Sequence, residues 1–436
     1  MKDKFPAKLK RRLKNNRLGI LAGEVKKFVF NTPREFNKLE KRFISVKPEG
    51  PLRGHVLLCY ENQAFFVKPG ERVPNDHTNR WEALEIAKTF REIGYQVDVI
   101  GENNDRFMPV KPYAFFVGNR INFERIAKSL NQDCVKILHI DTAHWLFNNT
   151  GEHQRLLALQ RRRNFTLPTR RSLKPNLAIE HADYATILGN EFTISTYRYA
   201  KKPIYRLPIS TPVEYPWAED KDFEQSRKHF LWFGSGGFVH KGLDLVLDAF
   251  ADMPEYHLTI CGPIHKEKDF MRAYHEMLYQ LPNIHTEGWV DIGGSRFLEI
   301  TRNCLGLIYP SCSEGGGGSV ISCMHAGLIP IVSREASVDV NESFGLILKE
   351  CSIEEIKNSI RKISSLSAQE LKQMAQTAWD FARANHTKER FAGEYKKIIS
   401  AIMTLVSDQK RVIERTASPG NFYETAAGRV SDSGAR

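Results

Sequence analysis

The sequence predicts an α/β protein built from two doubly wound domains. Apolar segments typical of buried strands alternate with segments of helical periodicity, once from His55 onwards and again from Phe230 to about Leu348. Between the two series, residues 205–228 contain three prolines and several charges, which is typical of a linker. The chain has 436 residues, of which 42% are hydrophobic, so it can bury two cores.

The first series follows a polar and basic N-terminal stretch. Its apolar runs predict strands at residues 56–60, 96–100, 115–117, 135–140 and 184–188. A helix is expected from Asn79 to Ile93, and Gly94 follows it as a C-terminal cap. His77, Thr78 and Asn79 lie at the start of this helix, where they either cap it or face a cleft. Capping is favoured for Thr78 and Asn79.

The second series begins with a strand at residues 230–233, and helices at 367–385 and 388–406 end the fold. Residues 407–436 are rich in Ser, Gly, Thr and charge and have little to bury, so we expect a disordered tail. The predicted units are a basic N-terminal arm at 1–50, a first domain at 51–210, a second domain at 211–386, a closing helix at 387–406 and the tail at 407–436.

A glycine-rich loop in the second series carries the most specific functional signal. Residues 307–332 read LIYPSCSEGGGGSVISCMHAGLIPIV, so a strand is followed by Glu314, four glycines and a helix from about Ser319 to His325. Glycine backbone can approach a ligand closely, and the helix start aims free N–H groups at the same spot. The pattern predicts an anion-binding loop beside a carboxylate, as a sugar phosphate ester requires. The alternative is a flexible turn.

A second glycine loop follows the strand at 230–233. Gly234, Ser235, Gly236 and Gly237 precede Lys241, which opens an amphipathic helix. A lysine between the loop and the helix of a strand–loop–helix unit lies where a phosphate would bind. A charge-assisted hydrogen bond there is worth about 1.5–3 kcal/mol. The alternative is a solvated lysine at a helix end.

Together, these segments resemble the donor-binding half of retaining, nucleotide-sugar-dependent glycosyltransferases of the GT-B fold, the group 1 type. The resemblance covers about residues 229–335 and places the family's lysine on Lys241 and its first glutamate on Glu314. The family's arginine five residues before the lysine is Gly236 here, and its second glutamate is Ser322. Lys241 would then carry more of the phosphate charge alone, or another basic residue would reach in.

The resemblance implies a GT-B fold, with two doubly wound Rossmann-like domains and an interdomain cleft, an acceptor site in the first domain and a donor site in the second. The implied catalytic residues are Lys241, Glu314 and His144; His144 would contact the donor sugar across the cleft, with Asp141 as a weaker neighbour. The expected donor-binding residues are Gly236, Gly237, Gly262, Val290, Gly316, Gly317, Gly318, Ser319 and Ser322. Gly262 matches a strand-end glycine, and Val290 lies in a segment that the family lays against the nucleobase.

The resemblance therefore implies sugar transfer from a UDP- or GDP-linked donor to an acceptor hydroxyl, with retention, without a metal and without a cofactor. Synthesis of a glycan or cell-surface polysaccharide is the expected context, with a glycan or lipid-linked acceptor. Two alternatives stay open at this point. One is a degenerate domain that binds nucleotides or glycans without turnover, and the other is a nucleotide-sugar epimerase.

The net charge of +12 favours acidic partners. Basic residues of the arm either hold the protein at an anionic membrane surface or are simply solvated: Lys8, Lys10, Arg11, Arg12, Lys14 and Arg17. A second basic segment, residues 161–171, either meets a phosphate-bearing acceptor such as a polyprenyl diphosphate or is an exposed helix end. Nucleic acid is not expected, because these runs lack interleaved aromatic residues.

The remaining composition points to the cytoplasm, with peripheral contact at the inner membrane surface. No apolar run reaches the roughly 20 residues of a membrane span, and no signal peptide follows the basic start. The seven cysteines form no C-x-x-C pair, which favours free thiols over disulfides or a zinc site.

Overall fold

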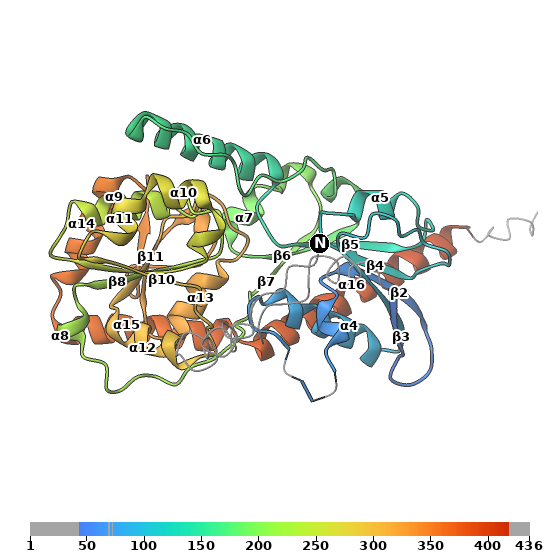
Figure 1. Ribbon diagram of the computed structural model, residues 1–436. Coiled ribbons are helices and arrows are strands. Elements are labelled where there is room, and N and C mark those ends of the chain that lie inside the picture. The colour runs from blue at the N-terminus through green and yellow to red at the C-terminus, as the bar shows by residue number, and fades with distance from the viewer. Residues whose placement is uncertain (1–42, 69, 72, 418–436) are drawn as a thin grey trace, which may run out of the picture.

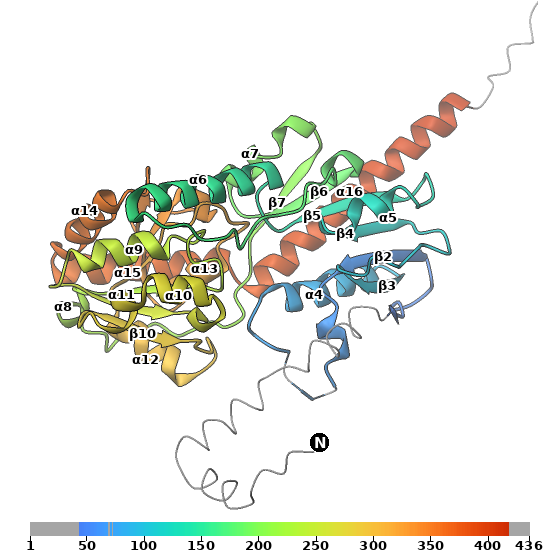
Figure 2. The ribbon, with the colours of Figure 1, turned by 45° about the horizontal axis from the view of Figure 1, so that its top comes forward.

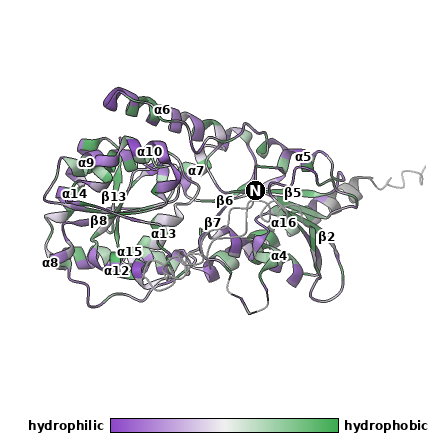
Figure 3. Ribbon diagram, viewed as in Figure 1, coloured by the Kyte–Doolittle hydropathy of each residue, from purple (hydrophilic) through white to green (hydrophobic). Residues whose placement is uncertain are grey.

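The computed structural model describes residues 43–417 except residues 69 and 72, and it contains two α/β domains (Figure 1). The first domain is built on a seven-stranded sheet in the order β1-β3-β2-β4-β5-β6-β7, in which β1 is antiparallel to β3 and the other pairs are parallel. Its strands are β1 (Phe43–Val46), β2 (Gly54–Tyr60), β3 (Tyr95–Gly101), β4 (Phe115–Gly118), β5 (Val135–Ile140), β6 (Tyr184–Leu188) and β7 (Ile204–Leu207). Both faces of the parallel strands are buried, so their sequences are almost continuously apolar (Figure 3).

Helices alternate with these strands along the chain. They are α4 (Asn79–Glu92), α5 (Phe123–Ala127), α6 (Trp145–Arg163) and α7 (Glu191–Ser195), with 3₁₀ turns η1 (Gln63–Phe66), η2 (Ile179–His181) and η3 (Arg198–Ala200). The start of α4 is capped by His77, whose Nδ1 accepts from the Asn79 N–H at 3.2 Å, rather than by a Thr78 side chain. The last helix, α16 (Lys388–Ala417), returns to the first domain and buries Phe391, Tyr395 and Ile402 in the core beside α4.

The second domain is built on a six-stranded, all-parallel sheet in the order β10-β9-β8-β11-β12-β13. Its strands are β8 (His229–Phe233), β9 (His257–Cys261), β10 (Ile284–Gly288), β11 (Gly306–Tyr309), β12 (Ile329–Ser333) and β13 (Leu346–Leu348). Its helices are α8 (Phe223–Ser226), α9 (Leu243–Ala251), α10 (Lys268–Ala273), α11 (His275–Tyr279), α12 (Ser295–Asn303), α13 (Gly318–His325), α14 (Ile353–Ser364) and α15 (Ala368–Asn385), with turns η4 (Ile264–Lys266) and η5 (Arg334–Ala336). The chain order reverses between β8 and β11, which opens a crevice at the carboxyl ends of these strands.

Helix α6 connects the two domains in an unexpected way. It leaves the end of β5 in the first domain and runs over the second domain, close to α9 and α10 (Figures 1 and 2). Near its C-terminus, Leu159 is buried in the core of the second domain. Arg162 pairs there with Asp244 at 2.7 Å and with Asp248 at 2.6 Å, both on α9. Helix α6 therefore joins the two domains through its side-chain contacts, in addition to the chain connections between them.

Three predicted boundaries differ from the structure. β1 lies inside the arm predicted for residues 1–50; it is a short edge strand that only partly buries Ile44 and Val46, so its apolar signal is weak. β7 places residues 205–207, the start of the predicted linker, in the first sheet. α16 continues to Ala417, past the predicted end at 406, because the residues that follow include good helix formers. The rest of the predicted arm and tail, residues 1–42 and 418–436, lies outside the described residues.

Candidate active site

Lys241 and Glu314 meet in the crevice between β8 and β11. The Nζ of Lys241 lies 2.5 Å from the Oε1 of Glu314 and donates to the Tyr309 hydroxyl at 2.7 Å. Lys241 lies just before α9, and Glu314 follows β11, so two neighbouring strands of one sheet bring the pair together. Lys241 is 4% exposed, and the side chain of Glu314 is 13% exposed. The two motif residues of the sequence thus form one buried ion pair.

Three donors fix the carboxylate of Glu314. Besides Lys241, the Tyr309 hydroxyl donates to Oε1 at 2.9 Å and the Ser311 hydroxyl at 3.0 Å. Burial alone would raise the pKa of Glu314, but the charges of Lys241 and Arg171 outweigh it and lower that pKa to about 2. Burial lowers the pKa of Lys241, and the charge of Glu314 opposes that change. Glu314 is therefore ionised at neutral pH and acts as a hydrogen-bond acceptor.

The four-glycine loop lies against the first domain. An ideal Cβ on Gly315 would lie 2.0 Å from the carbonyl oxygen of Asp141, at the end of β5. Gly316 has a φ of +154° and faces Ile209, and Gly317 has a φ of +58° and faces Val338. The loop therefore requires glycine where the two domains touch. Contact of Gly316, Gly317 and Gly318 with a ligand stays a prediction.

Helix α13 begins directly after this loop, at Gly318. Ser319, on its first turn, hydrogen-bonds the Tyr309 hydroxyl beside Glu314. The Ser322 hydroxyl donates to the Gly318 carbonyl at 2.9 Å, within its own helix. Ser322 is thus buried and already engaged, whereas Ser319 lies at the ion pair.

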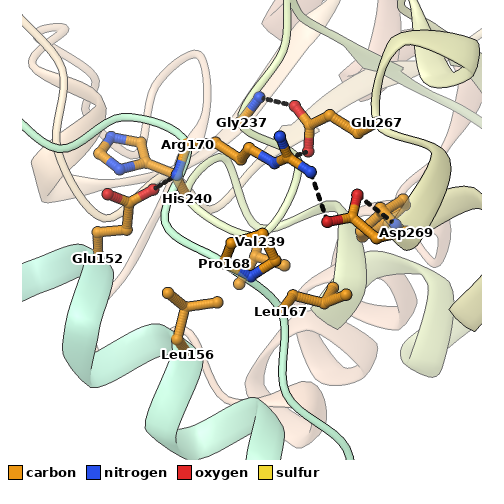
Figure 4. A pocket seen from close by; sticks show the side chains of 11 residues that line it. Glu152, Leu156, Leu167, Pro168, Arg170, Gly237, Val239, His240, Glu267 and Asp269 are labelled. Carbon is orange, nitrogen blue, oxygen red and sulfur yellow. Dashed lines mark hydrogen bonds and ion pairs between the residues drawn. The ribbon is translucent and has the colours of Figure 1, made fainter.

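The other glycine loop already holds a carboxylate. The Gly237 N–H donates to Glu267, and an ideal Cβ on Gly236 would lie 3.1 Å from the same oxygen (Figure 4). Burial raises the pKa of Glu267, and hydrogen bonds from the Gly237 and Phe238 amides oppose that change. The amide of Gly237 predicted for phosphate is therefore engaged by this side chain. Sequence reasoning missed Glu267, which lies thirty residues further along the chain outside any motif.

The structure places His144 at the start of α6. Its Nδ1 accepts from the Leu146 N–H at 3.4 Å, and its Nε2 lies 3.1 Å from the Tyr199 hydroxyl. Burial lowers the pKa of His144, which favours the neutral ring, and the charge of Glu180 opposes that change. Both ring nitrogens thus contact first-domain groups, and the backbone of Asp141 is what touches the glycine loop. Contact of His144 with a donor sugar stays a prediction.

Gly262 and Val290 have packing roles in the structure. A Cβ on Gly262 would lie 2.7 Å from the Gly234 carbonyl, so this position keeps the ends of β8 and β9 close. The side chain of Val290 is buried in the core of the second domain, whereas its neighbour Trp289 is 55% exposed. Contact of either residue with a nucleotide stays a prediction.

The first domain contributes two acids with raised pKa values, Glu82 and Glu102. Glu82, on the first turn of α4, accepts from the Ser210 hydroxyl at 3.3 Å, and burial raises its pKa to about 7. Glu102, at the end of β3, accepts from Asn119, and burial likewise raises its pKa to about 7. Among the described residues, no cluster of three metal-ligating side chains is found. Within the same part of the chain, no helix is long and apolar enough to cross a membrane.

Comparisons with known proteins agree with this architecture. Residues 218–379 match the family model of glycosyl transferases group 1. Sucrose-phosphate synthase from Thermosynechococcus elongatus is similar in structure, with a TM-score of 0.57 and 13% identity over 81% of this chain and 100% of that chain. The lipopolysaccharide outer core galactosyltransferase WaaB has a TM-score of 0.53 and 12% identity, over 80% of this chain and 99% of that chain.

The Anabaena protein HepE, solved in complex with UDP-glucose, has a TM-score of 0.51 and 12% identity over 80% of this chain and 100% of that chain. The chain spans about half of the length (54%) of the structures of TarM, at a TM-score of 0.47. No curated protein matches the sequence significantly. The predicted fold is thus confirmed: the molecule has the GT-B fold, and its second domain matches the glycosyl transferases group 1 family, which supports a glycosyltransferase.

Proposed function

We propose that the protein transfers a sugar from a nucleotide-diphosphate sugar to an acceptor hydroxyl. The observation that carries this proposal is the buried Lys241–Glu314 pair at the carboxyl ends of β8 and β11, facing the first domain. The family match over this domain supports it, as does the complex of HepE with UDP-glucose. A UDP- or GDP-linked donor fits a site that offers one ammonium group and one carboxylate.

In the proposed reaction, the bond between the anomeric carbon and the diphosphate oxygen breaks while the bond to the acceptor oxygen forms on the same face of the sugar. The acceptor proton passes to the departing diphosphate. Lys241 would stabilise the negative charge that grows on the diphosphate, because preorganised charges act most where charge develops. Glu314 would accept hydrogen bonds from the sugar hydroxyls. No step requires a metal ion.

A glycan or lipid-linked acceptor completes the proposal, in polysaccharide synthesis. Its support is indirect: WaaB is named as acting on the lipopolysaccharide outer core, and the N-terminal stretch of this chain is basic. We propose a cytoplasmic protein whose basic arm touches an anionic inner membrane surface. That arm lies outside the described residues.

The test compares Lys241→Ala and Glu314→Ala with the intact protein. Release of nucleoside diphosphate is measured with UDP- and GDP-sugars and a glycan acceptor, at a temperature where circular dichroism shows each variant folded. Each variant is expected to lose at least about 100-fold in rate, as removal of a transition-state donor does elsewhere. The matched control is Lys88→Ala, which breaks the exposed ion pair of Lys88 with Glu85 and should leave the rate unchanged. Near-normal rates in both site variants would contradict the proposal.

A binding domain without turnover is the second candidate. It is favoured by Lys241, which is already paired with Glu314, and by the Gly237 amide, which already binds Glu267. A rise in melting temperature with UDP or GDP, without release of nucleoside diphosphate from any donor, would select this candidate over sugar transfer.

A further inference from the structure

The charge of the crevice is too small for a diphosphate. Lys241 is neutralised by Glu314, which the ion pair keeps ionised. His240, beside them, brings no charge at pH 7, because burial lowers its pKa to about 4. A nucleotide diphosphate carries at least two negative charges, so a further cation in the crevice would strengthen its binding.

Arg171 is placed to supply it. Its side chain crosses the glycine loop of the second domain: an ideal Cβ on Gly237 would lie 2.5 Å from its Cγ and 2.9 Å from its Cδ. Its positive charge acts on Lys241, Glu314 and His240 alike. The guanidinium group therefore lies within electrostatic reach of the ion pair, on the side of the Gly236–Gly237 loop.

The backbone of Arg171 is held by α6. The N–H groups of Arg170 and Arg171 donate to one oxygen of Glu152 at 2.7 and 2.8 Å. The Ser172 hydroxyl donates to the other oxygen of Glu152 at 3.0 Å, and Asn148 donates to the Arg171 carbonyl at 2.9 Å. Glu152 is only 2% exposed. A segment fixed by four hydrogen bonds loses little conformational freedom when its side chain binds a ligand.

The two neighbouring arginines are used differently. The guanidinium of Arg170 pairs with Asp269, and its Nε lies 4.0 Å from the Oε2 of Glu267 (Figure 4). The side chain of Arg171 is exposed, and within the described part of the chain no hydrogen bond or ion pair of its guanidinium is found. Arg170 thus serves the attachment of the segment to the second domain, which leaves the planar donor fork of Arg171 for an anion.

We infer that Arg171, which belongs to the first domain, binds the diphosphate of the nucleotide donor together with Lys241 of the second domain. This inference rests on the proposed function and adds a residue to it. The basic segment 161–171 then has a role other than contact with a lipid-linked acceptor. The donor site is complete only while α6 and the segment that follows it lie on the second domain.

The test uses isothermal titration of the full chain with UDP, GDP, uridine and farnesyl diphosphate. Arg171→Gln is expected to weaken UDP or GDP binding about 10-fold or more, as loss of a charge-assisted hydrogen bond does, and to leave uridine binding unchanged. Arg171→Lys should restore part of the loss. Arg161→Gln, an exposed arginine on α6, is the matched control and should bind as the intact protein does. Equal melting temperatures show that the variants are folded.

The outcomes separate the two proposals. If the intact protein binds UDP or GDP and Arg171→Gln binds it equally well, the inference is wrong while the proposed function stands. If Arg171→Gln loses only farnesyl diphosphate binding, the inference is wrong in a different way, because the diphosphate is then that of a lipid-linked acceptor. If the intact protein binds neither nucleotide, the proposed donor class is wrong, and the inferred contact of Arg171 with its diphosphate is wrong as well.

Discussion

Glu314 and Glu82 are both buried carboxylates, yet their surroundings shift their pKa values in opposite directions. Glu314 faces Lys241 and Arg171, whose charges lower its pKa to about 2. Glu82 faces the hydroxyls of Thr78 and Ser210, which cannot offset burial, and its pKa rises to about 7. Glu314 is therefore built to stay charged, whereas Glu82 binds a proton near neutral pH.

The buried Glu82 should make the protein less stable as the pH rises. Its pKa is about 4.5 in the unfolded chain and about 7 in the folded one, so the folded state holds more protons between these values. The free energy of unfolding should fall by about 3 kcal/mol across that window because of this group. Glu82→Gln should remove this part of the pH dependence and be more stable than the intact protein at pH 8.

Urea unfolding at pH 5 and at pH 8 measures the effect. The comparison is between variant and intact protein at each pH, because Glu102 also has a raised pKa and contributes a similar slope to both. Glu85→Gln, on the same helix, is the control, since its carboxylate has a cationic partner in Lys88 at 3.3 Å. Parallel curves for Glu82→Gln and the intact protein would show that Glu82 is ionised in the folded state.

Among the elements, α6 departs most from what local sequence indicates. Its C-terminal arginines follow an ordinary helical pattern, which predicts an exposed helix end or an acceptor contact. Arg162 instead pairs with Asp244 and Asp248, more than eighty residues away on α9. Asp244 is fully buried. A partner at such a sequence distance leaves no local signal, and only the fold brings the two helices together.

Arg162→Ala should therefore destabilise the second domain strongly. It removes the guanidinium that bonds the buried carboxylate of Asp244, whereas the charge of Arg155 still acts on that carboxylate, so we expect a cost at the lower end of the about 3–5 kcal/mol typical of a broken buried pair. Arg161→Ala, one residue away but exposed, should change stability by less than about 0.5 kcal/mol. Urea unfolding followed by tryptophan fluorescence distinguishes them. Equal stability of the two variants would mean that water replaces the partner of Asp244.

The contrast between local sequence signals and contacts from distant segments explains how much of the fold and site the sequence can predict. Strands β2, β5 and β8 are predictable because burial on both faces makes their sequences continuously apolar. β1 gives no such signal because it is a half-exposed edge strand. Lys241 and Glu314 each follow a buried strand and lie beside a glycine loop, so local motifs locate them. Glu267 reaches the site from a distant segment that no motif marks, and the basic segment that contains Arg171 indicates a phosphate contact without indicating the Gly236–Gly237 loop as its location.

At the scale of the whole molecule, the glycine loop sets the distance between the domains. Gly315 lies against the backbone of Asp141 and Thr142, and Thr193 of the first domain contacts Ser337 of the second. α16 returns to the first domain, where the Nζ of Lys396 lies 3.0 Å from the Oε2 of Glu92. The donor loop of one domain and the strand ends of the other thus share one contact surface. A change at this surface alters the cleft without touching either core.

Gly315→Ala should open the cleft while both domains stay folded. A Cβ there would lie 2.0 Å from the Asp141 carbonyl oxygen. The three atoms nearest to it all belong to the backbone of Asp141 and Thr142, so no flexible side chain can move away to make room. The two domains must then separate at this contact, which moves the strand ends of the first domain away from Lys241. We expect a larger radius of gyration by small-angle X-ray scattering and a loss of transfer rate of about 100-fold, as small displacements of reacting groups produce. Gly393→Ala, in α16 with open space around its Cα, is the matched control and should change neither quantity. An unchanged radius of gyration in Gly315→Ala, together with a normal transfer rate, would show that the loop shifts within its own domain and does not set the contact.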